Sequence, residues 1–485
     1  MLTRSDLLKS LCLINGQWQG ADNGDTFPVT NPANGETITA VPRCGVAETN
    51  RAIDAANAAL PEWRSRSAKE RAVILRRWFD LIMANQKDLA LILTQEQGKP
   101  LAEASGEVAY GAAFIEWFAE EARRVYGDIL QSNNAAQRML VLKQPIGVVA
   151  AITPWNFPVA MITRKAGPAL AAGCTVVIKP ASETPLSALA LVALAEEAGV
   201  PAGVINVVTG SAGIIGPTLT QSPIVRKLSF TGSTEIGRRL MAESADTLKK
   251  LSLELGGNAP FIVFEDADLD LAVQGAMVSK YRNSGQTCVC SNRFLVHEKI
   301  HDSFVEKLFA AVSRLTLGAG WESGVTQGPL INMAAVTRIE AILEQAVIDG
   351  ANIICGGKRS ALGGLFFEPT IITGVRNDSA LAQSELFAPV APVIRFSSDE
   401  EAVRLANDSE FGLASYMYTR DINRIFRVSE ALEYGMVGIN EGLISTEVAP
   451  FGGIKASGFG REGSKYGVDE YMEKKYICIG SVTGS

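Results

Sequence analysis

The sequence predicts a protein of the mixed α/β class with more than one doubly wound domain. Between residues 146 and 255, short apolar runs alternate with stretches of helical character, which is the pattern of βαβ units in a parallel sheet. A second region with the same alternation extends from 257 to 440. The chain has 485 residues, of which 47% are hydrophobic, and chains of this length usually divide their interior among two or three cores.

The N-terminal part, from 48 to 125, has the spacing of helices that face a core. Ser67 and Glu70 stand in a capping-box pattern, and apolar residues follow them at helical intervals. The break Gly98-Lys-Pro100 predicts the end of one helix and the start of another. We interpret this part as structural.

The first α/β region contains five candidate strands and a clear crossover helix. The helix is predicted over 185–198, where Gly199 and Pro201 stop it. Ligands of doubly wound sheets bind at the carboxyl ends of the strands, so a nucleotide crevice is expected there. The candidate strands are 148–152, 175–178, 204–208, 227–230 and 251–255 in the first region, and 260–264 and 437–440 in the second, where a helix is predicted over 269–280.

Composition argues against several classes of partner. The net charge is -7 and no run of five Lys or Arg occurs, so nucleic acid and anionic membrane surfaces are not expected partners. Pro, Asn, Arg and Lys interrupt the most apolar region, 146–178, which excludes a simple membrane span. Residues 1–20 lack the features of a signal peptide, and the seven cysteines do not form a disulfide pattern, so we expect a cytoplasmic protein with reduced thiols.

Two motifs point to other functions. His297-Glu-Lys-Ile-His301 matches the H-E-x-x-H pattern of zinc peptidases, which requires both histidines on one face of a helix. The residues before His297 have strand character. A third ligand would have to be a carboxylate, and Glu322, which is at a tolerable distance, falls in a Gly/Trp loop. No metal is therefore expected, and a zinc metallopeptidase is kept as the distant alternative. The G-x-G-x-x-G match at 458–463 lies too near the C-terminus to open a βαβ unit and predicts a turn.

One cysteine lies in a segment suited to chemistry. Cys288 ends the polar, Gly-containing stretch 283–288 that follows a predicted helix, so it is expected on a loop where a ligand can reach it. A thiol is the best side-chain nucleophile near neutral pH. Taken alone, however, a cysteine is more often structural than nucleophilic.

Six motifs read together resemble the aldehyde dehydrogenase superfamily, in order and in approximate spacing, over nearly the whole chain. They are Ala151-Ile-Thr-Pro-Trp-Asn-Phe-Pro158, Lys179-Pro-Ala-Ser-Glu-Thr-Pro185, Phe230-Thr-Gly-Ser233, Leu253-Glu-Leu-Gly-Gly257, Gly285-Gln-Thr-Cys288 and Glu385-Leu-Phe387. The resemblance implies an aldehyde dehydrogenase-like fold: two doubly wound α/β domains, a Rossmann-like cofactor domain and a catalytic domain, with a small β oligomerisation arm. The implied boundaries are 1–125 with 145–256, then 257–445, and 126–144 with 465–485 for the arm.

The resemblance also implies the catalytic residues. Cys288 matches the nucleophile that attacks the aldehyde carbonyl, and Asn156 matches the amide that stabilises the resulting alkoxide together with the backbone N–H of the cysteine. Glu254 matches the base that activates water against the thioester, and its apolar neighbours Leu253 and Leu255 are expected to raise its pKa. Because relatives that pass the acyl group to coenzyme A generally lack this base, Glu254 favours hydrolysis to the free acid.

Cofactor residues follow partly from the βαβ pattern and partly from the resemblance. Gly232 and Ser233 lie between a strand and a helix, where free N–H groups and the helix dipole suit a pyrophosphate. Ser182 stands where NAD-preferring relatives commonly carry Glu, so NADP is the predicted cofactor, with NAD as the alternative. Ala388 replaces a usual Gly and would strain the turn if φ there were positive. The other residues assigned to the cofactor by resemblance are Trp155, Asn156, Lys179, Leu255, Glu385 and Phe387.

Within the superfamily the chain looks most similar to succinate-semialdehyde dehydrogenases. The resemblance lies in the stretches 161–165, 281–283 and 442–453 and implies that Arg164, Arg282 and Ser445 bind the distal carboxylate of the substrate. Charge-assisted hydrogen bonds from two guanidinium groups suit that task, although either Arg could instead pair with a protein carboxylate. Glutarate semialdehyde, one methylene longer, remains an alternative because a methylene contributes little discrimination.

Two further expectations concern regulation and assembly. Cys290 is a candidate redox partner of Cys288, although a neighbouring cysteine is more often inert. The β-like stretches beginning at Gly127 and Lys475 match segments through which superfamily members pair with another subunit, so a homotetramer is expected.

Overall fold

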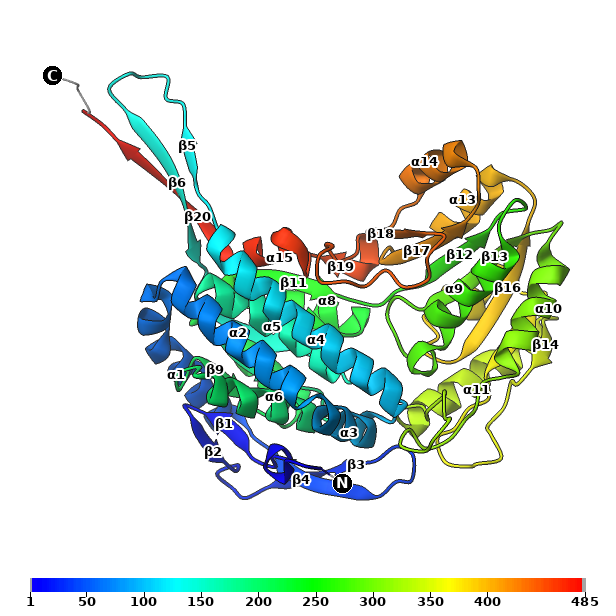
Figure 1. Cartoon of the computed structure of the whole chain (residues 1–485), viewed down its shortest axis with the longest axis horizontal. Coiled ribbons are helices and arrows are strands. Elements are labelled where there is room, and N and C mark those ends of the chain that lie inside the picture. The colour runs from blue at the N-terminus through cyan, green and yellow to red at the C-terminus, as the bar shows by residue number, and fades with distance from the viewer. Residues whose placement is uncertain (1, 482–485) are drawn as a thin grey trace.

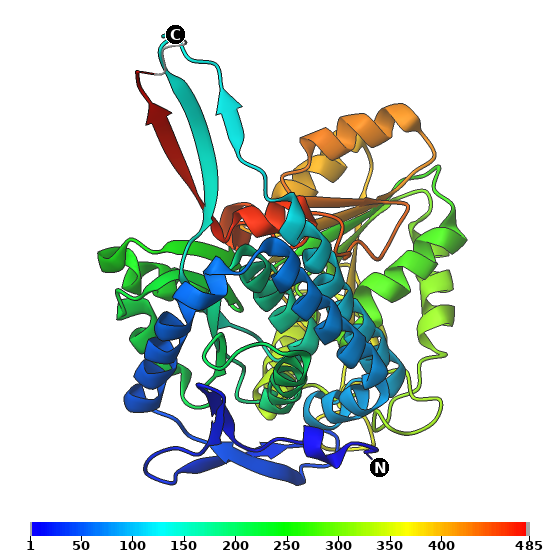
Figure 2. The same ribbon diagram turned by 60° about the vertical axis from the view of Figure 1, so that its left-hand side comes forward.

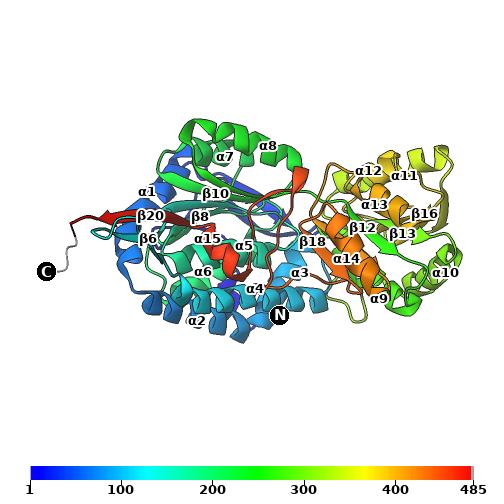
Figure 3. The ribbon, with the colours of Figure 1, turned by 90° about the horizontal axis from the view of Figure 1, so that it is seen from above.

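The computed structural model describes residues 2–481 and shows two α/β lobes and a projecting β arm (Figure 1). Each lobe has a sheet with helices on both faces, and the lobes lie side by side when viewed from above (Figure 3). The C-terminal segment leaves the second lobe after β18, crosses over the first lobe and enters the arm (Figure 1). The predicted α/β class is therefore confirmed.

The first lobe is built on an eight-stranded sheet in the order β19-β11-β10-β7-β8-β9-β1-β2. Its central strands run parallel, as their apolar sequences predict, and are buried on both faces. The strands are β1 (Cys12–Ile14), β2 (Gln17–Gln19), β7 (Val148–Ile152), β8 (Thr175–Lys179), β9 (Ile205–Val207), β10 (Val225–Thr231), β11 (Lys250–Glu254) and β19 (Gly458–Phe459).

Helices cover the first sheet unevenly. One face packs against a single helical layer, and the other packs against α5 and α6, which an outer layer covers in turn (Figure 3). The single layer is α1 (Val46–Ser65), α7 (Ala212–Gln221) and α8 (Thr234–Glu243); the double layer is α5 (Pro158–Ala172) and α6 (Pro185–Ala198) beneath α2 (Ala68–Ala84), α3 (Gln86–Gln97) and α4 (Leu101–Glu121). A small hairpin of β3 (Thr26–Thr30) and β4 (Thr37–Pro42) lies near the N-terminus.

The second lobe has a seven-stranded sheet in the order β14-β15-β16-β13-β12-β17-β18, parallel except at the β14 edge. Its strands are β12 (Ala259–Val263), β13 (Ser291–His297), β14 (Asn352–Cys355), β15 (Thr370–Thr373), β16 (Val390–Phe396), β17 (Ala414–Tyr418) and β18 (Met436–Ile439). Its helices are α9 (Leu269–Tyr281), α10 (His301–Val312), α11 (Met333–Ile348), α12 (Ala380–Gln383), α13 (Asp399–Asn407) and α14 (Ile422–Ala431). The two faces of this sheet carry separate apolar cores.

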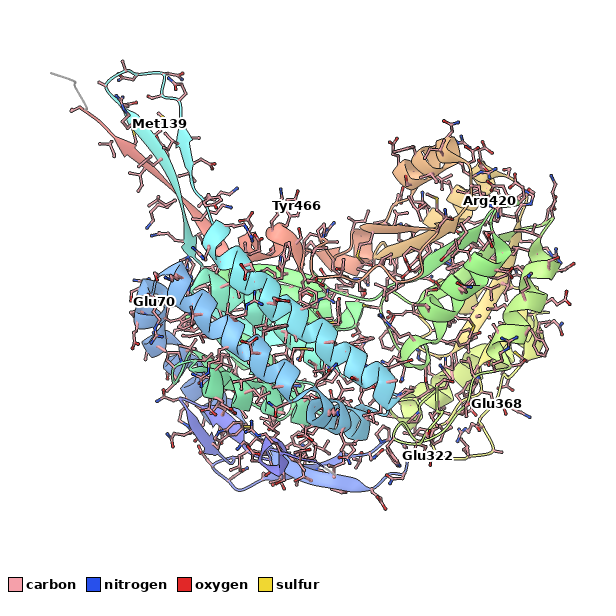
Figure 4. The ribbon with its side chains drawn as sticks, in the orientation of Figure 1. Glu70, Met139, Glu322, Glu368, Arg420 and Tyr466 are labelled. Atoms are coloured by element: carbon pink, nitrogen blue, oxygen red, sulfur yellow. The ribbon has the colours of Figure 1, made fainter. Side chains whose placement is uncertain are left out.

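The arm is a three-stranded sheet in the order β20-β6-β5, and it stands away from both lobes (Figure 2). It consists of β5 (Asp128–Leu130), β6 (Arg138–Pro145) and β20 (Met472–Ile479), and the short helix α15 (Ser464–Asp469) precedes β20. Met139 lies on the arm, whereas Arg420 lies at the far side of the second lobe (Figure 4). Residues 482–485 of the predicted arm segment are outside the described part of the chain.

Most sequence-based element predictions are close to the observed bounds. Strand β7 and helix α6 have the predicted limits, and Ser67 caps α2 reciprocally with Glu70. The division into domains by residue range remains an interpretation. Strand β19, which that division placed in neither lobe, pairs antiparallel with β11 and so ties the C-terminal segment to the first sheet.

Candidate active site

A cavity of about 320 Å³ lies where the two lobes meet, and residues from both lobes line it. Strand ends β7, β10 and β11 contribute from the first lobe, and the segments around Cys288 and Glu385 contribute from the second. This is the expected crevice at the carboxyl ends of parallel strands. Of the predicted site residues, the cavity brings together Trp155, Asn156, Gly232, Ser233, Leu255, Cys288, Glu385 and Phe387.

Cys288 is held on a loop that glycines allow to pack closely. The loop follows α9 through a turn in which Asn283 and Ser284 have positive φ. A Cβ on Gly257 would lie 2.2 Å from the Cys288 carbonyl oxygen, so only glycine permits this approach. Burial raises the pKa of the Cys288 thiol to about 12, with Arg164 acting in the opposite direction. The group is therefore a thiol at neutral pH and must lose its proton to react.

Asn156 is fixed on both its backbone and its side chain. It follows β7, is 3% exposed, and its Nδ2 donates to the Gln286 carbonyl at 3.1 Å, two residues from Cys288. Its Oδ1 accepts from the Phe157 N–H at 3.1 Å. This orientation leaves the second proton of the amide group free of those bonds, as an oxyanion donor requires.

Glu254 ends β11 and is buried without a hydrogen-bond partner for either carboxylate oxygen among residues 2–481. Burial and the neighbouring Glu462 carboxylate raise its pKa well above the usual range, against the opposing effect of Arg164. A carboxylate in this environment is a stronger base than an exposed one. It has the properties that water activation needs.

The buried cluster beside Glu254 was missed by sequence reasoning. Lys165 donates to Glu462 and, at 2.6 Å, to Thr231 Oγ1, and Arg164 Nε lies 2.8 Å from Glu462 Oε2. These two cations outweigh burial and lower the pKa of Glu462, so it stays ionised next to Glu254. Glu462 lay within the G-x-G-x-x-G stretch interpreted as a turn, and no local pattern connects it with Lys165.

The first-lobe side of the cavity fits a dinucleotide. Gly232 and Ser233 line it directly before α8, and Ser233 caps that helix. Free N–H groups at a helix start suit a pyrophosphate. A Cβ on Gly256 would lie 2.8 Å from Glu385 Oε2, so Glu385 can approach the backbone here only because residue 256 is glycine. The residues present therefore fit NAD or NADP.

Lys179 and Ser182 lie outside the lining of this cavity. Lys179, the last residue of β8, is buried, which lowers its pKa, and the Glu183 carboxylate opposes that shift. Ser182 is exposed in the following bend. Glu183, whose carboxylate follows Ser182 directly in the chain, adds a negative charge close to Lys179 that the assignment by resemblance did not include.

The segment from Glu385 to Ala388 shows one departure from expectation. Glu385 Oε1 accepts from the Gly257 N–H at 2.9 Å, and burial raises its pKa to about 7. Phe387 lies edge-on to Trp155, with ring centroids 5.6 Å apart. Positive φ occurs at Phe387 (52°) and not at Ala388, so the strain feared for alanine is absent. The condition under which alanine would strain the turn is not met, because the left-handed residue is one position earlier.

The predicted carboxylate-binding residues divide into two environments. Arg282 and Ser445 line one small cavity between α9 and the loop after β18. Arg164 is 1% exposed and pairs with Glu462, which was one of the outcomes left open, yet its Nη2 has no hydrogen-bond partner within the described residues. Tyr110, which no motif indicated, adds a buried hydroxyl whose pKa burial raises and the two arginines oppose.

Cys290 and the two histidines lie in structural surroundings. Cys290 is buried, with Sγ 3.5 Å from the Lys280 carbonyl oxygen, and burial raises its pKa. His297 ends β13 and His301 begins α10, so they do not share a helix face. Residues 2–481 contain no group of three or more His, Cys, Asp or Glu side chains arranged to hold a metal, and none of their helices is long and apolar enough to cross a membrane.

A loop cysteine, a buried amide and a high-pKa carboxyl at a cavity that fits a dinucleotide are the groups that an NAD(P)-dependent dehydrogenase with a covalent thioester requires. The model of the aldehyde dehydrogenase family matches residues 18–477, and the chain belongs to that family. Dehydrogenases of this family oxidise aldehydes with NAD or NADP.

Close relatives share almost the full length of the chain. It is 63% identical to glutarate-semialdehyde dehydrogenase of Pseudomonas aeruginosa, covering 99% of this chain and 100% of the relative. It is 62% identical to NADP+ succinate-semialdehyde dehydrogenase of Escherichia coli, covering 99% of each chain. The crystal structure of succinate-semialdehyde dehydrogenase from Burkholderia pseudomallei superposes with a TM-score of 0.98 at 64% identity, covering 99% of each chain. The aldehyde dehydrogenase fold is confirmed.

Proposed function

We propose that this enzyme oxidises an aldehyde bearing a distal carboxylate, with succinate semialdehyde converted to succinate as the leading reaction. The observation that carries the proposal is that Arg282 and Ser445 line the same small cavity. In addition, Arg164 has an Nη2 without a hydrogen-bond partner within residues 2–481 and lies close enough to Cys288 to lower the pKa of its thiol. Unpaired guanidinium N–H groups suit a carboxylate ligand. The names of the relatives, which include two ω-carboxylated semialdehydes, support the same class.

In the proposed mechanism, Cys288 gives up its thiol proton to water, and the thiolate attacks the aldehyde carbon to form a tetrahedral adduct with a negative oxygen. Asn156 Nδ2 and the Cys288 N–H stabilise the negative oxygen of that adduct, which typically contributes on the order of 10²–10³ in rate per donor. The bound nicotinamide supplies the acceptor for the hydride that leaves the adduct. Cys288 then carries the acyl group as a thioester.

Glu254 completes the proposed cycle by hydrolysis. It takes a proton from water as the water attacks the thioester carbon, and the C–S bond breaks to release the acid and return the thiol. Its raised pKa makes the carboxylate a stronger proton acceptor than an exposed one. Glu462, held ionised by Lys165 and Arg164, keeps that pKa high. Free acid, rather than an acyl thioester of coenzyme A, is the proposed product.

NADP is the proposed preferred cofactor, with NAD as the second. A hydroxyl at Ser182 near the ammonium group of Lys179 tolerates a 2′-phosphate, which a carboxylate at that position would repel. Glu183 limits this preference because it stands beside the same lysine. Comparison of kcat/KM for the two cofactors tests it, and a ratio strongly in favour of NAD contradicts it.

Glutarate semialdehyde is the second candidate substrate, favoured by the 63% identity to a dehydrogenase of that name. One methylene contributes only about 1–3 kcal/mol of discrimination. A kcat/KM that is higher for the five-carbon than for the four-carbon semialdehyde would reverse the order of the two proposals.

The decisive experiment measures NADPH formation at 340 nm with aldehydes that do and do not carry a terminal carboxylate. We expect turnover of the carboxylated series in wild type and none in Cys288→Ala. Arg282→Ala should raise KM for succinate semialdehyde 10-fold or more and leave KM for an uncharged aldehyde of similar length nearly unchanged. An unchanged ratio between the two aldehydes would contradict the carboxylate pocket.

We propose a cytoplasmic homotetramer as the working state. Ile129, Leu130, Tyr476 and Ile479 are exposed on the arm, and apolar exposure of this kind is typical of a surface that a partner covers. β20 and β18 are both unpaired sheet edges. Light scattering after gel filtration tests the assembly; a monomeric mass would contradict it.

A further inference from the structure

A buried ion pair lies at the break between α3 and α4, next to the backbone of Asn156. Lys99 lies in this break and Glu107 lies two turns into α4, and their exposed fractions are 2% and 3%. Lys99 Nζ and Glu107 Oε2 are 2.5 Å apart. No sequence motif indicated either residue, and neither lines the catalytic cavity.

Glu107 holds the start of α5 in place. Its Oε1 accepts hydrogen bonds from the N–H groups of Val159, at 2.9 Å, and Ala160, at 3.3 Å, in the first turn of that helix. A carboxylate at a helix N-terminus is stabilised by the unpaired N–H groups and by the helix dipole. Because Asn156 stands two residues before α5, Glu107 anchors the segment that carries it.

Lys99 reaches Asn156 directly. Its Nζ donates to the Asn156 carbonyl oxygen at 2.7 Å and lies 3.9 Å from the centre of the Phe157 ring. Asn283, from the cysteine loop, donates to the same oxygen at 3.1 Å. Lys99 in the α3–α4 break therefore holds the backbone of Asn156 by a hydrogen bond, and the Asn156 side chain donates to the cysteine loop.

Stability alone does not account for such a pair. Replacing a buried ion pair by apolar groups is often neutral or stabilising, because taking two charges out of water costs about as much as their attraction returns. Beyond their bond to each other, Lys99 donates to the Asn156 carbonyl oxygen, and Glu107 accepts from two N–H groups in the first turn of α5. We propose that Lys99, oriented by Glu107, is a positioning residue that keeps the Asn156 amide aimed at the alkoxide formed on Cys288.

This inference rests on the proposed role of Asn156 and predicts an effect on turnover. A displacement of about 1 Å in a catalytic group can lower the rate about 100-fold. Reactivity of the thiol with an alkylating agent needs no oxyanion donor. It should therefore be unchanged when Lys99 no longer holds the Asn156 backbone.

The test is the paired variant Lys99→Met/Glu107→Gln, which removes both charges and leaves neither buried alone. The matched control is Glu96→Gln. Glu96 is a buried carboxylate that caps α6 through the Leu186 and Ser187 N–H groups, at 2.7 and 2.8 Å, in the way that Glu107 caps α5. The measurements are kcat, KM for the cofactor, inactivation rate with iodoacetamide and Tm. Asn156→Ala is assayed alongside.

We expect kcat of the paired variant to fall 30-fold or more, with the iodoacetamide rate within about threefold of wild type. Glu96→Gln should keep kcat within twofold. Lys99→Arg, which preserves the charge and a donor, should recover part of the lost kcat and serves if the paired variant does not fold.

Two results would overturn the proposal, and they differ from failure of the catalytic assignment. A kcat no lower than that of Glu96→Gln, or an equal loss of kcat and of iodoacetamide reactivity, would reduce the pair to a structural role. If Asn156→Ala itself turns over normally, the proposed oxyanion role fails instead. A slow Asn156→Ala beside a fast paired variant refutes only the positioning by Lys99.

Discussion

Two buried ion clusters contact helix α5, one at its start and one near its middle, and they differ in how completely their polar groups are paired. At the start of α5, Glu107 uses both oxygens, and Lys99 bonds to Glu107 and to the Asn156 carbonyl. Farther along, Arg164 and Lys165 pair with Glu462, but Arg164 Nη2 and both oxygens of Glu254 are unpaired within residues 2–481.

The completeness of hydrogen bonding distinguishes the groups that position the active site from the groups that are available to react in it. A buried polar group without a partner is costly, so a fold retains it where a ligand or reacting water satisfies it in use. In the closed cluster, formed by Lys99 and Glu107, the charged groups already bond to the protein. The open cluster, formed by Arg164, Lys165, Glu462 and Glu254, has a free donor on Arg164 and a free base on Glu254, and these suit a carboxylate and a water molecule.

The largest expected effect comes from the base of the open cluster. Glu254→Gln keeps the shape but removes proton acceptance, so steady-state turnover should fall on the order of 10³-fold while the first turnover still yields a burst of NADPH. Stopped-flow absorbance at 340 nm measures both phases. Loss of the burst together with the steady rate would show that Glu254 acts before the thioester forms.

The next largest effect tests the closed cluster. Glu107→Ala leaves the Lys99 ammonium buried without its partner and the first turn of α5 without a cap, and breaking such a pair typically costs about 3–5 kcal/mol. We expect a clear fall in Tm by calorimetry. Arg239→Ala, which breaks an exposed i,i+4 pair with Glu243, is the control and should change Tm little. Equal shifts in the two variants would contradict the contrast.

A smaller effect concerns pH. Glu462 raises the pKa of Glu254, so Glu462→Gln should lower that pKa. Because the base acts only when it is ionised, the acid limb of the kcat profile should move to lower pH, by roughly one unit. Profiles between pH 5 and 9 in wild type and variant measure the shift. A limb that moves to higher pH, or that does not move, would contradict the control of the Glu254 pKa by Glu462.

The smallest effect extends the comparison to a third buried lysine. Lys227 donates to Ser252 and lies 3.6 Å from a Glu470 oxygen and 5.0 Å from the centre of the Tyr471 ring, and burial lowers its pKa to about 8. The unfolded chain therefore binds the proton more tightly, and the stability of wild type should rise as pH increases from 8 toward 10.5. In Lys227→Met that rise should be smaller, with Tm at pH 7 higher than wild type. Parallel Tm curves against pH would contradict the assignment.

Much of this site could be predicted from the sequence because its motifs follow strand ends. Asn156, Gly232 and Glu254 each come just after or at the end of an apolar run, and parallel strands deliver such residues to one edge. Glu462 and Lys165 could not be paired in advance, because they are 297 residues apart and join through the return of the C-terminal segment. A role for Lys99 could not be predicted, because the Gly98-Lys-Pro100 stretch indicates only a boundary between two helices.

The sequence by itself determined the α/β class, the order of the elements and the family, since apolar periodicity and local motifs survive without tertiary context. It also indicated Cys288, Asn156 and Glu254 as candidates. Only the tertiary structure decided which charges stand beside two of them: Glu462 next to Glu254, and Lys99 behind Asn156. The physical reason is that burial and long-range pairing set the pKa and the orientation of a side chain, and neither is encoded in its neighbours along the chain.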